Sequence, residues 1–109
     1  MPIPEISVEA ARLLLAAPNP PRLIDVRELE EWELCRLPGA EHLPLSQFAE
    51  LGPRMLQDSE QPLLIYCHHG GRSGRVTEFL LQQGFTNVTN LAGGIDAWAV
   101  EIDPSVPRY

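Results

Sequence analysis

The sequence contains no apolar run that approaches the length of a membrane-spanning helix. Its first residues, 1–5, lack the basic start of a secretory signal peptide. Cysteine is scarce: Cys35 and Cys67 are too few to predict a disulfide scaffold at this size. Basic residues number eight against fifteen acidic ones, and the net charge of −7 argues against nucleic-acid or anionic-lipid partners. We therefore expect a cytoplasmic protein that binds neither nucleic acid nor a membrane.

Apolar and amphipathic segments alternate along the 109 residues, a length that suits one domain over 1–109. Short apolar runs predict strands at 22–26, 41–43, 63–66 and 88–91. Helices are expected from a Ser7 cap to before Pro18, at 29–34, from a Ser46 cap through Leu51, after the 67–73 loop to a Gly84 cap, and at 94–99. We expect the segment 103–109 to run extended over the surface. Strand–helix alternation with short connections predicts an α/β fold with a mainly parallel sheet.

Cys67 directly follows the predicted strand 63–66 and precedes a glycine-containing loop and a helix. In a parallel sheet, this order places the thiol at the carboxyl end of a buried strand, below the amino end of a helix. Free N–H groups and the positive end of the helix dipole favour an anion at that point. A thiol in such surroundings tends to ionise and to become a nucleophile, so Cys67 is the predicted catalytic residue.

The loop after the cysteine carries the residue types of an anion-binding site. Gly70 and Gly71 permit positive φ, so successive backbone N–H groups can turn toward one centre. Arg72, together with His68 and His69 when they are protonated, places cations where the helix dipole alone would favour acidic groups. An anion between these cations and the helix end accounts for that arrangement.

Three segments in sequence order resemble the motifs of rhodanese-type sulfurtransferases, and the resemblance covers nearly the whole chain. The segment Cys67 to Ser73 resembles the family's active-site loop. LIDVR at 23–27, followed by Glu31-Trp32 and by LPGA at 37–40, resembles the upstream signature, and LAGGIDAW at 91–98 resembles the closing signature. The usual Gly-His before the LPGA turn is replaced here by Cys35-Arg36.

The resemblance implies a three-layer sandwich around a five-stranded, mainly parallel sheet. It also implies that Cys67 carries a transferable sulfur as a persulfide, taken from a small anionic donor such as thiosulfate and passed to a thiol or cyanide. A sulfur-relay protein is a further candidate partner, and no cofactor or metal is expected. The substrate-binding residues it implies are His68, His69, Gly70, Gly71, Arg72 and Ser73. Asp25 and Arg27 match the family's paired charges and are expected to support the loop structurally.

Two other classes of protein share this fold. Phosphatases place five residues between a catalytic cysteine and arginine, whereas four separate Cys67 from Arg72 here. The shorter loop suits a single sulfur better than a phosphoryl group; arsenate reduction is open on similar grounds. A binding module without catalysis is the other alternative, which the presence of Cys67 disfavours. The loop does not match the patterns of the dedicated thiosulfate or mercaptopyruvate enzymes, so the donor and acceptor stay open.

Several residues also have plainer interpretations. His68 and His69 beside Cys67 suggest a metal site, but neighbouring side chains are expected to point apart and no fourth ligand lies at a usual spacing. Cys35 is interpreted as a tolerated side chain rather than a resolving thiol. Glu31 is a candidate local partner for Arg27. Core or partly buried packing is expected for the aromatic residues Trp32, Phe79 and Trp98.

Overall fold

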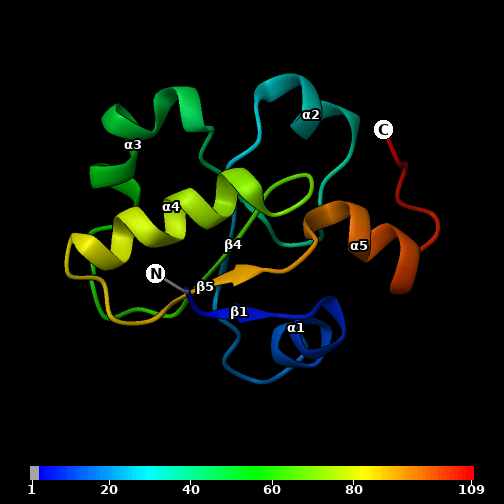
Figure 1. The fold of residues 1–109 in the computed structure, drawn as a ribbon, viewed down its shortest axis with the longest axis horizontal. Helices are drawn as coiled ribbons and strands as arrows, with labels where there is room; N and C mark the ends of the chain where they lie inside the picture. Colours follow the sequence, from blue (N-terminus) through cyan, green and yellow to red (C-terminus); the bar gives the residue numbers. More distant parts are fainter. Residues whose placement is uncertain (1–2) are drawn as a thin grey trace.

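The computed structural model describes residues 3–109 and is built on a five-stranded parallel sheet with the order β1-β5-β4-β2-β3 (Figure 1). The strands are β1 (Glu5–Ile6), β2 (Arg22–Asp25), β3 (Glu41–His42), β4 (Leu63–Tyr66) and β5 (Val88–Leu91). The α/β fold with helices on both faces of a parallel sheet is confirmed. The residue pattern missed β1, because a strand of two residues is too short to show an alternation.

The helices also lie close to the segments that the sequence predicted. They are α1 (Val8–Leu15), α2 (Leu29–Leu34), α3 (Phe48–Met55), α4 (Gly71–Gln82) and α5 (Gly94–Glu101), with a 3₁₀ helix η1 (Leu45–Gln47) before α3. The Ser7 cap is confirmed, since its hydroxyl accepts a hydrogen bond from Ala10 N at 3.1 Å. The Ser46 cap was wrong: Ser46 lies within η1, and its hydroxyl donates to the Glu28 carboxylate. None of the helices in residues 3–109 is both long and apolar enough to span a membrane.

Two apolar clusters cover the two faces of the sheet. Along β4 the side chains alternate, as a strand requires. Leu63, Ile65 and Cys67 belong to the cluster that packs under α3 and α4. Leu64 and Tyr66 belong to the opposite cluster, which includes residues of α1 and α5. The thiol therefore starts from the α4 face, at the carboxyl end of the central strand.

Residues 103–109 lie at the surface, as the sequence suggested, but they do not run extended. They turn back to the carboxyl end of the sheet and end beside α2 (Figure 1). Val106 packs on the cluster shared with α1 and α5, and Arg108 pairs with Asp96 of α5 at 2.9 Å. Tyr109 reaches Glu31 of α2. The prediction failed because these contacts join positions far apart in the sequence.

Candidate active site

Cys67 lies immediately after β4, with only 1% of the residue exposed. Gly70 N lies 3.1 Å from its Sγ and donates a hydrogen bond to it, while the Ser73 hydroxyl lies 3.3 Å away. Gly70 adopts φ +105° as the residue before α4, the left-handed conformation that glycine permits at low cost. The predicted order of strand, thiol, turn and helix amino end is confirmed. Since the thiol is covered, a donor reaches it only when the neighbouring groups move.

Backbone N–H groups at the amino end of α5 hold the loop that begins at the thiol, because they donate to the loop's carbonyl oxygens. Ile95 N donates to Cys67 O at 2.9 Å, and Asp96 N donates to His68 O at 3.1 Å. Gly94 makes this approach feasible: a Cβ on it would lie 2.5 Å from both carbonyl oxygens. The closing signature is therefore the support under the active-site loop, a role that its sequence alone did not reveal.

Gly94→Ala is expected to displace the peptide between Cys67 and His68 and to lower the rate of reaction at the thiol by about 100-fold, the scale of an ångström-level misplacement. Gly84→Ala is the matched control, since Gly84 also has positive φ (+95°) but no atom within 4 Å of the new Cβ. Both variants should lose about 1–2 kcal/mol of stability from left-handed strain. Steady-state kinetics and urea unfolding separate the two effects. Equal rates in the two variants would contradict the supporting role.

Ser73 connects the thiol to β5 through a polar network. Its hydroxyl lies 2.6 Å from Asn90 Oδ1, and Asn90 Nδ2 donates to Gly70 O at 3.2 Å and to Glu5 at 2.9 Å. A hydroxyl has a single hydrogen, so it cannot donate to Asn90 and to the sulfur at once. The shorter distance assigns this hydrogen to Asn90, which leaves the Ser73 oxygen as acceptor for a Cys67 S–H. The Ser73 hydroxyl can donate to the sulfur only if it turns away from Asn90.

Arg72 does not stand free above the thiol. Its two terminal nitrogens form a bidentate pair with Glu31, at 2.7 Å (Nη1–Oε1) and 2.9 Å (Nη2–Oε2). The expected pairing of Glu31 with Arg27 was wrong, because Arg27 precedes α2 and turns to Asp25. The pair with Arg72 lowers the pKa of Glu31 to about 2 and raises that of Arg72 above its usual value. Both side chains are therefore ionised at any ordinary pH.

Tyr109 stacks on a histidine of the loop and hydrogen-bonds two charged side chains, Glu31 and Arg27. Its ring stacks on His68, with centroids 3.8 Å apart and planes 5° apart. Its hydroxyl donates to Glu31 Oε2 at 2.7 Å and accepts from Arg27 Nη1 at 2.8 Å. Burial, followed by these two contacts with opposite effects, raises the pKa of Tyr109 to about 12. The hydroxyl thus keeps its hydrogen and bridges two groups of opposite charge.

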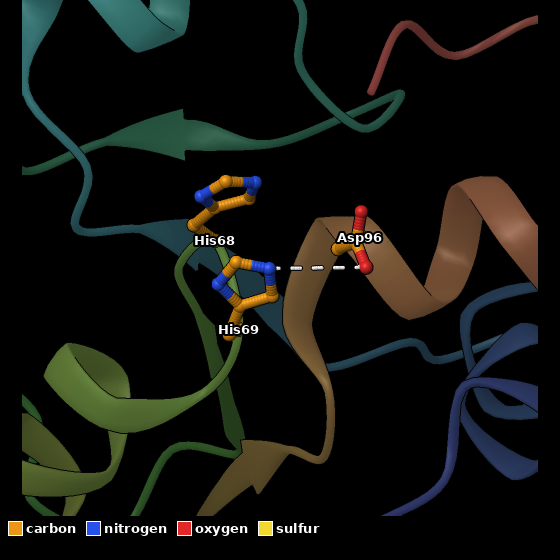
Figure 2. Close-up of side chains that lie close together, drawn as sticks. All are labelled: His68, His69 and Asp96. Atoms are coloured by element: carbon orange, nitrogen blue, oxygen red, sulfur yellow. Dashed lines mark ion pairs between the residues drawn. The ribbon is translucent and has the colours of Figure 1, made fainter. Parts of the chain in front are cut away.

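His68 and His69 do not point apart, contrary to the expectation for neighbours in sequence. Their rings stack at 3.8 Å, with planes 29° apart, and His69 Nε2 lies 3.8 Å from Asp96 Oδ2 on α5 (Figure 2). The ligand atoms of these three side chains lie within 4.8 Å of one another, close enough to share a metal ion. However, Arg108 already donates to both oxygens of Asp96. Burial and His69 lower the pKa of His68, so it is neutral at pH 7.

Asp25 and Arg27 form a fully buried ion pair at the carboxyl end of β2. Arg27 Nη2 lies 2.7 Å from Asp25 Oδ2, and neither side chain is exposed to solvent. The Tyr66 hydroxyl donates to the same Asp25 oxygen at 2.7 Å, and Arg27 also donates to Cys35 O. Although burial opposes its charge, the Asp25 contact raises the pKa of Arg27 above its usual value. Neither residue hydrogen-bonds the thiol, so their placement agrees with a supporting role for the loop's surroundings.

The structure brings part of the predicted site together and adds residues that the sequence did not single out. Gly70 and Ser73 contact the sulfur, whereas Gly71 opens α4 and Arg72 turns to α2. The added residues are Glu5, Tyr66, Asn90, Gly94 and Tyr109. A polar asparagine in the predicted strand 88–91 was the one signal in the pattern. Of the aromatic residues, Phe79 is 47% exposed rather than buried, and it borders an apolar groove of about 600 Å³ between α3 and α4.

Comparison with known proteins shows which family this chain belongs to. A family model described as the rhodanese-like domain matches residues 7–101. The chain belongs to the rhodanese-like domain family. Among solved structures, the human single-domain sulfurtransferase TSTD1 superposes with a TM-score of 0.79 at 28% identity, covering 92% of this chain and 98% of that one. The expected family resemblance is thereby confirmed.

Curated relatives include longer proteins with rhodanese-like segments. The chloroplastic rhodanese-like/PpiC domain-containing protein 12 of Arabidopsis thaliana is 38% identical over 99% of this chain and 38% of its own length. The putative sulfur carrier protein YrkF of Bacillus subtilis is 34% identical over 88% of this chain and 51% of its own length. The chain thus spans about half or less of these two relatives. The rhodanese family membership, together with the sulfurtransferase TSTD1 and the putative sulfur carrier YrkF among its relatives, supports a role in sulfur transfer.

Proposed function

We propose that this rhodanese-like protein transfers a sulfane sulfur through a persulfide on Cys67. The observation that carries the proposal is the hydrogen bond from Gly70 N to Cys67 Sγ at 3.1 Å, made by a left-handed glycine at the start of α4. A backbone N–H fixed in this position stabilises negative charge on sulfur without reorganisation during the reaction. The amino end of α4 adds to the same effect.

The reaction has two balanced steps. The Cys67 thiolate attacks the outer sulfur of thiosulfate; a new S–S bond forms, the bond between the two thiosulfate sulfurs breaks, and sulfite leaves with the electron pair. Cyanide or a thiolate then attacks the outer sulfur of the persulfide, and the Cys67 thiolate leaves. Thiocyanate or a new persulfide is the product. Covalent transfer of this type gives ping-pong kinetics.

Other groups around the loop fit such a cycle. His68 Nε2 is buried and has no hydrogen-bond partner in the described part of the chain, which leaves it free for an oxygen of a bound donor. A relay in which a partner protein supplies or receives the sulfur is also part of the proposal, supported by the name of the relative YrkF, a putative sulfur carrier protein.

Intact-mass measurement tests the proposal directly. Incubation with thiosulfate is expected to add the mass of one sulfur atom to the protein, and cyanide is expected to remove it with formation of thiocyanate. Steady-state rates should show the parallel double-reciprocal lines of a ping-pong scheme. The proposal is wrong if no sulfane donor adds sulfur to the protein, or if the protein hydrolyses an aryl phosphate faster than it transfers sulfur.

A further inference from the structure

The guanidinium of Arg72, the cation of the active-site loop, is occupied by a carboxylate of the chain itself. Glu31 holds both of its terminal nitrogens in a bidentate pair at 2.7 and 2.9 Å. Such a fork geometry is the one in which arginine binds carboxylates and oxyanions. A donor that carries an oxyanion must therefore displace Glu31 before it can bind Arg72 in the same way.

Glu31 is fixed in this position from its other sides. The Tyr109 hydroxyl donates to Oε2 at 2.7 Å, and Glu28 N donates to Oε1 at 3.2 Å. Tyr109 is held in turn by Arg27 and by its stack on His68. The Glu31 side chain is only 19% exposed, so solvent screens its charge less than that of a surface residue. Since its pKa is about 2, the carboxylate stays charged throughout the working pH range.

Two other arginines of this region, Arg27 and Arg108, are also neutralised by a carboxylate. Arg27 is paired with Asp25, and Arg108 with Asp96. The neutral His68 adds no cation. A donor with two negative charges thus meets an approximately neutral site instead of the cationic one that the loop sequence suggests.

We infer that Glu31 is a specificity-determining residue that competes with oxyanionic donors for Arg72 and so disfavours doubly charged donors such as thiosulfate. Singly charged sulfane donors, such as organic thiosulfonates and persulfides, are the substrate class that the intact site favours. The inference rests on the proposed sulfur transfer. It does not require Glu31 to touch the reacting atoms, since the residue acts through Arg72.

The test compares thiosulfate with benzenethiosulfonate, which transfers its outer sulfur by the same bond changes and releases benzenesulfinate but carries one charge instead of two. Because Coulomb energy is proportional to donor charge, Glu31→Gln should lower KM about tenfold for thiosulfate and about threefold for benzenethiosulfonate. The kcat values should change less than about twofold, because the substitution alters donor binding rather than the chemical step. A general disturbance of the loop would instead lower kcat for both donors.

Glu33→Gln is the matched control, because it removes the same charge from an exposed position of the same helix. It should leave both KM values unchanged. Adding Arg72→Ala to Glu31→Gln should abolish the gain. Tyr109→Phe, which retains the ring but removes one donor to Glu31, should change the thiosulfate KM in the same direction by a smaller factor.

Equilibrium titration of thiosulfate into Cys67→Ser proteins, with and without Glu31→Gln, gives a readout that does not depend on turnover. The protein that also carries Glu31→Gln is expected to bind thiosulfate more tightly there as well. An unchanged affinity, or equal KM changes for the two donors, would overturn the inference while leaving the sulfur transfer intact. If neither donor adds sulfur to Cys67 in any protein that retains this thiol, the proposed function itself is wrong.

Discussion

Replacing Cys67 with serine is expected to reduce sulfur loading and sulfur transfer to background. A serine hydroxyl at this position is not ionised at neutral pH and cannot form a persulfide. Removing the nucleophile of an enzyme that works through a covalent intermediate costs on the order of 10⁶-fold in rate. Intact-mass spectra after thiosulfate or benzenethiosulfonate treatment, recorded beside thiocyanate production, measure the loss.

Cys35→Ser is the control for this prediction and should load sulfur as the unchanged protein does. Cys35 packs against the apolar cluster on the α1 and α5 face of the sheet, whereas Cys67 belongs to the cluster on the α3 and α4 face. The two thiols are thus directed to opposite sides of the sheet, which disfavours a resolving role for Cys35. Sulfur that remains on the Cys67→Ser protein and disappears with Cys35→Ser would reverse the assignment.

Asp25→Ala is expected to destabilise the fold by about 3–5 kcal/mol, the scale of breaking a buried ion pair by removing one partner. The substitution leaves the fully buried Arg27 without a counter-charge and the Tyr66 hydroxyl without its acceptor. Total stabilities of about 5–15 kcal/mol are usual, so the loss is a large part of the whole. Urea unfolding measures it as a lower midpoint.

Glu41→Ala provides the comparison, because it breaks an ion pair with Arg22 on the same strand, β2. That pair has good geometry, with a contact of 2.7 Å, but its side chains are 32% and 40% exposed. Removing an exposed pair costs about 0–1 kcal/mol. Similar losses in the two variants would mean that burial does not set the importance of the Asp25–Arg27 pair. Asp25→Asn, which preserves the volume of the side chain, gives a milder variant if the alanine protein does not fold.

The longer strands were among the most predictable parts of this fold, whereas the two-residue β1 was missed. β4 and β5 have the bounds that the sequence indicated, and β2 is one residue shorter. These segments are short apolar runs between turn residues, and their burial in a parallel sheet requires that composition. Ser46 misled because serine is a common cap, yet here the nearby Glu28 carboxylate offers its hydroxyl a stronger, charged acceptor.

The candidate site was predictable only where its parts are adjacent in the sequence. The thiol, Gly70 and Ser73 lie within one short segment, and their contacts follow from strand, turn and helix geometry. The partner of Arg72 is forty-one positions away on α2, and Tyr109, which contacts the same Glu31, is seventy-eight positions from it. Local patterns carry no information on such pairings, so a cation that looked free in the sequence turned out to be neutralised.

The pairing of β1 with β5 makes this fold depend on contacts between segments far apart in the sequence. Glu5 pairs with Asn90 and Ile6 with Leu91, so β1 can join the sheet only after β5 has formed (Figure 1). The groups that hold the loop also come late, from Asn90 of β5 and from Ile95 and Asp96 of α5. Until these later residues have packed, the loop around Cys67 lacks the hydrogen bonds that hold it. Such non-local closure slows folding, so the active-site loop is expected to be among the last parts of this protein to become ordered.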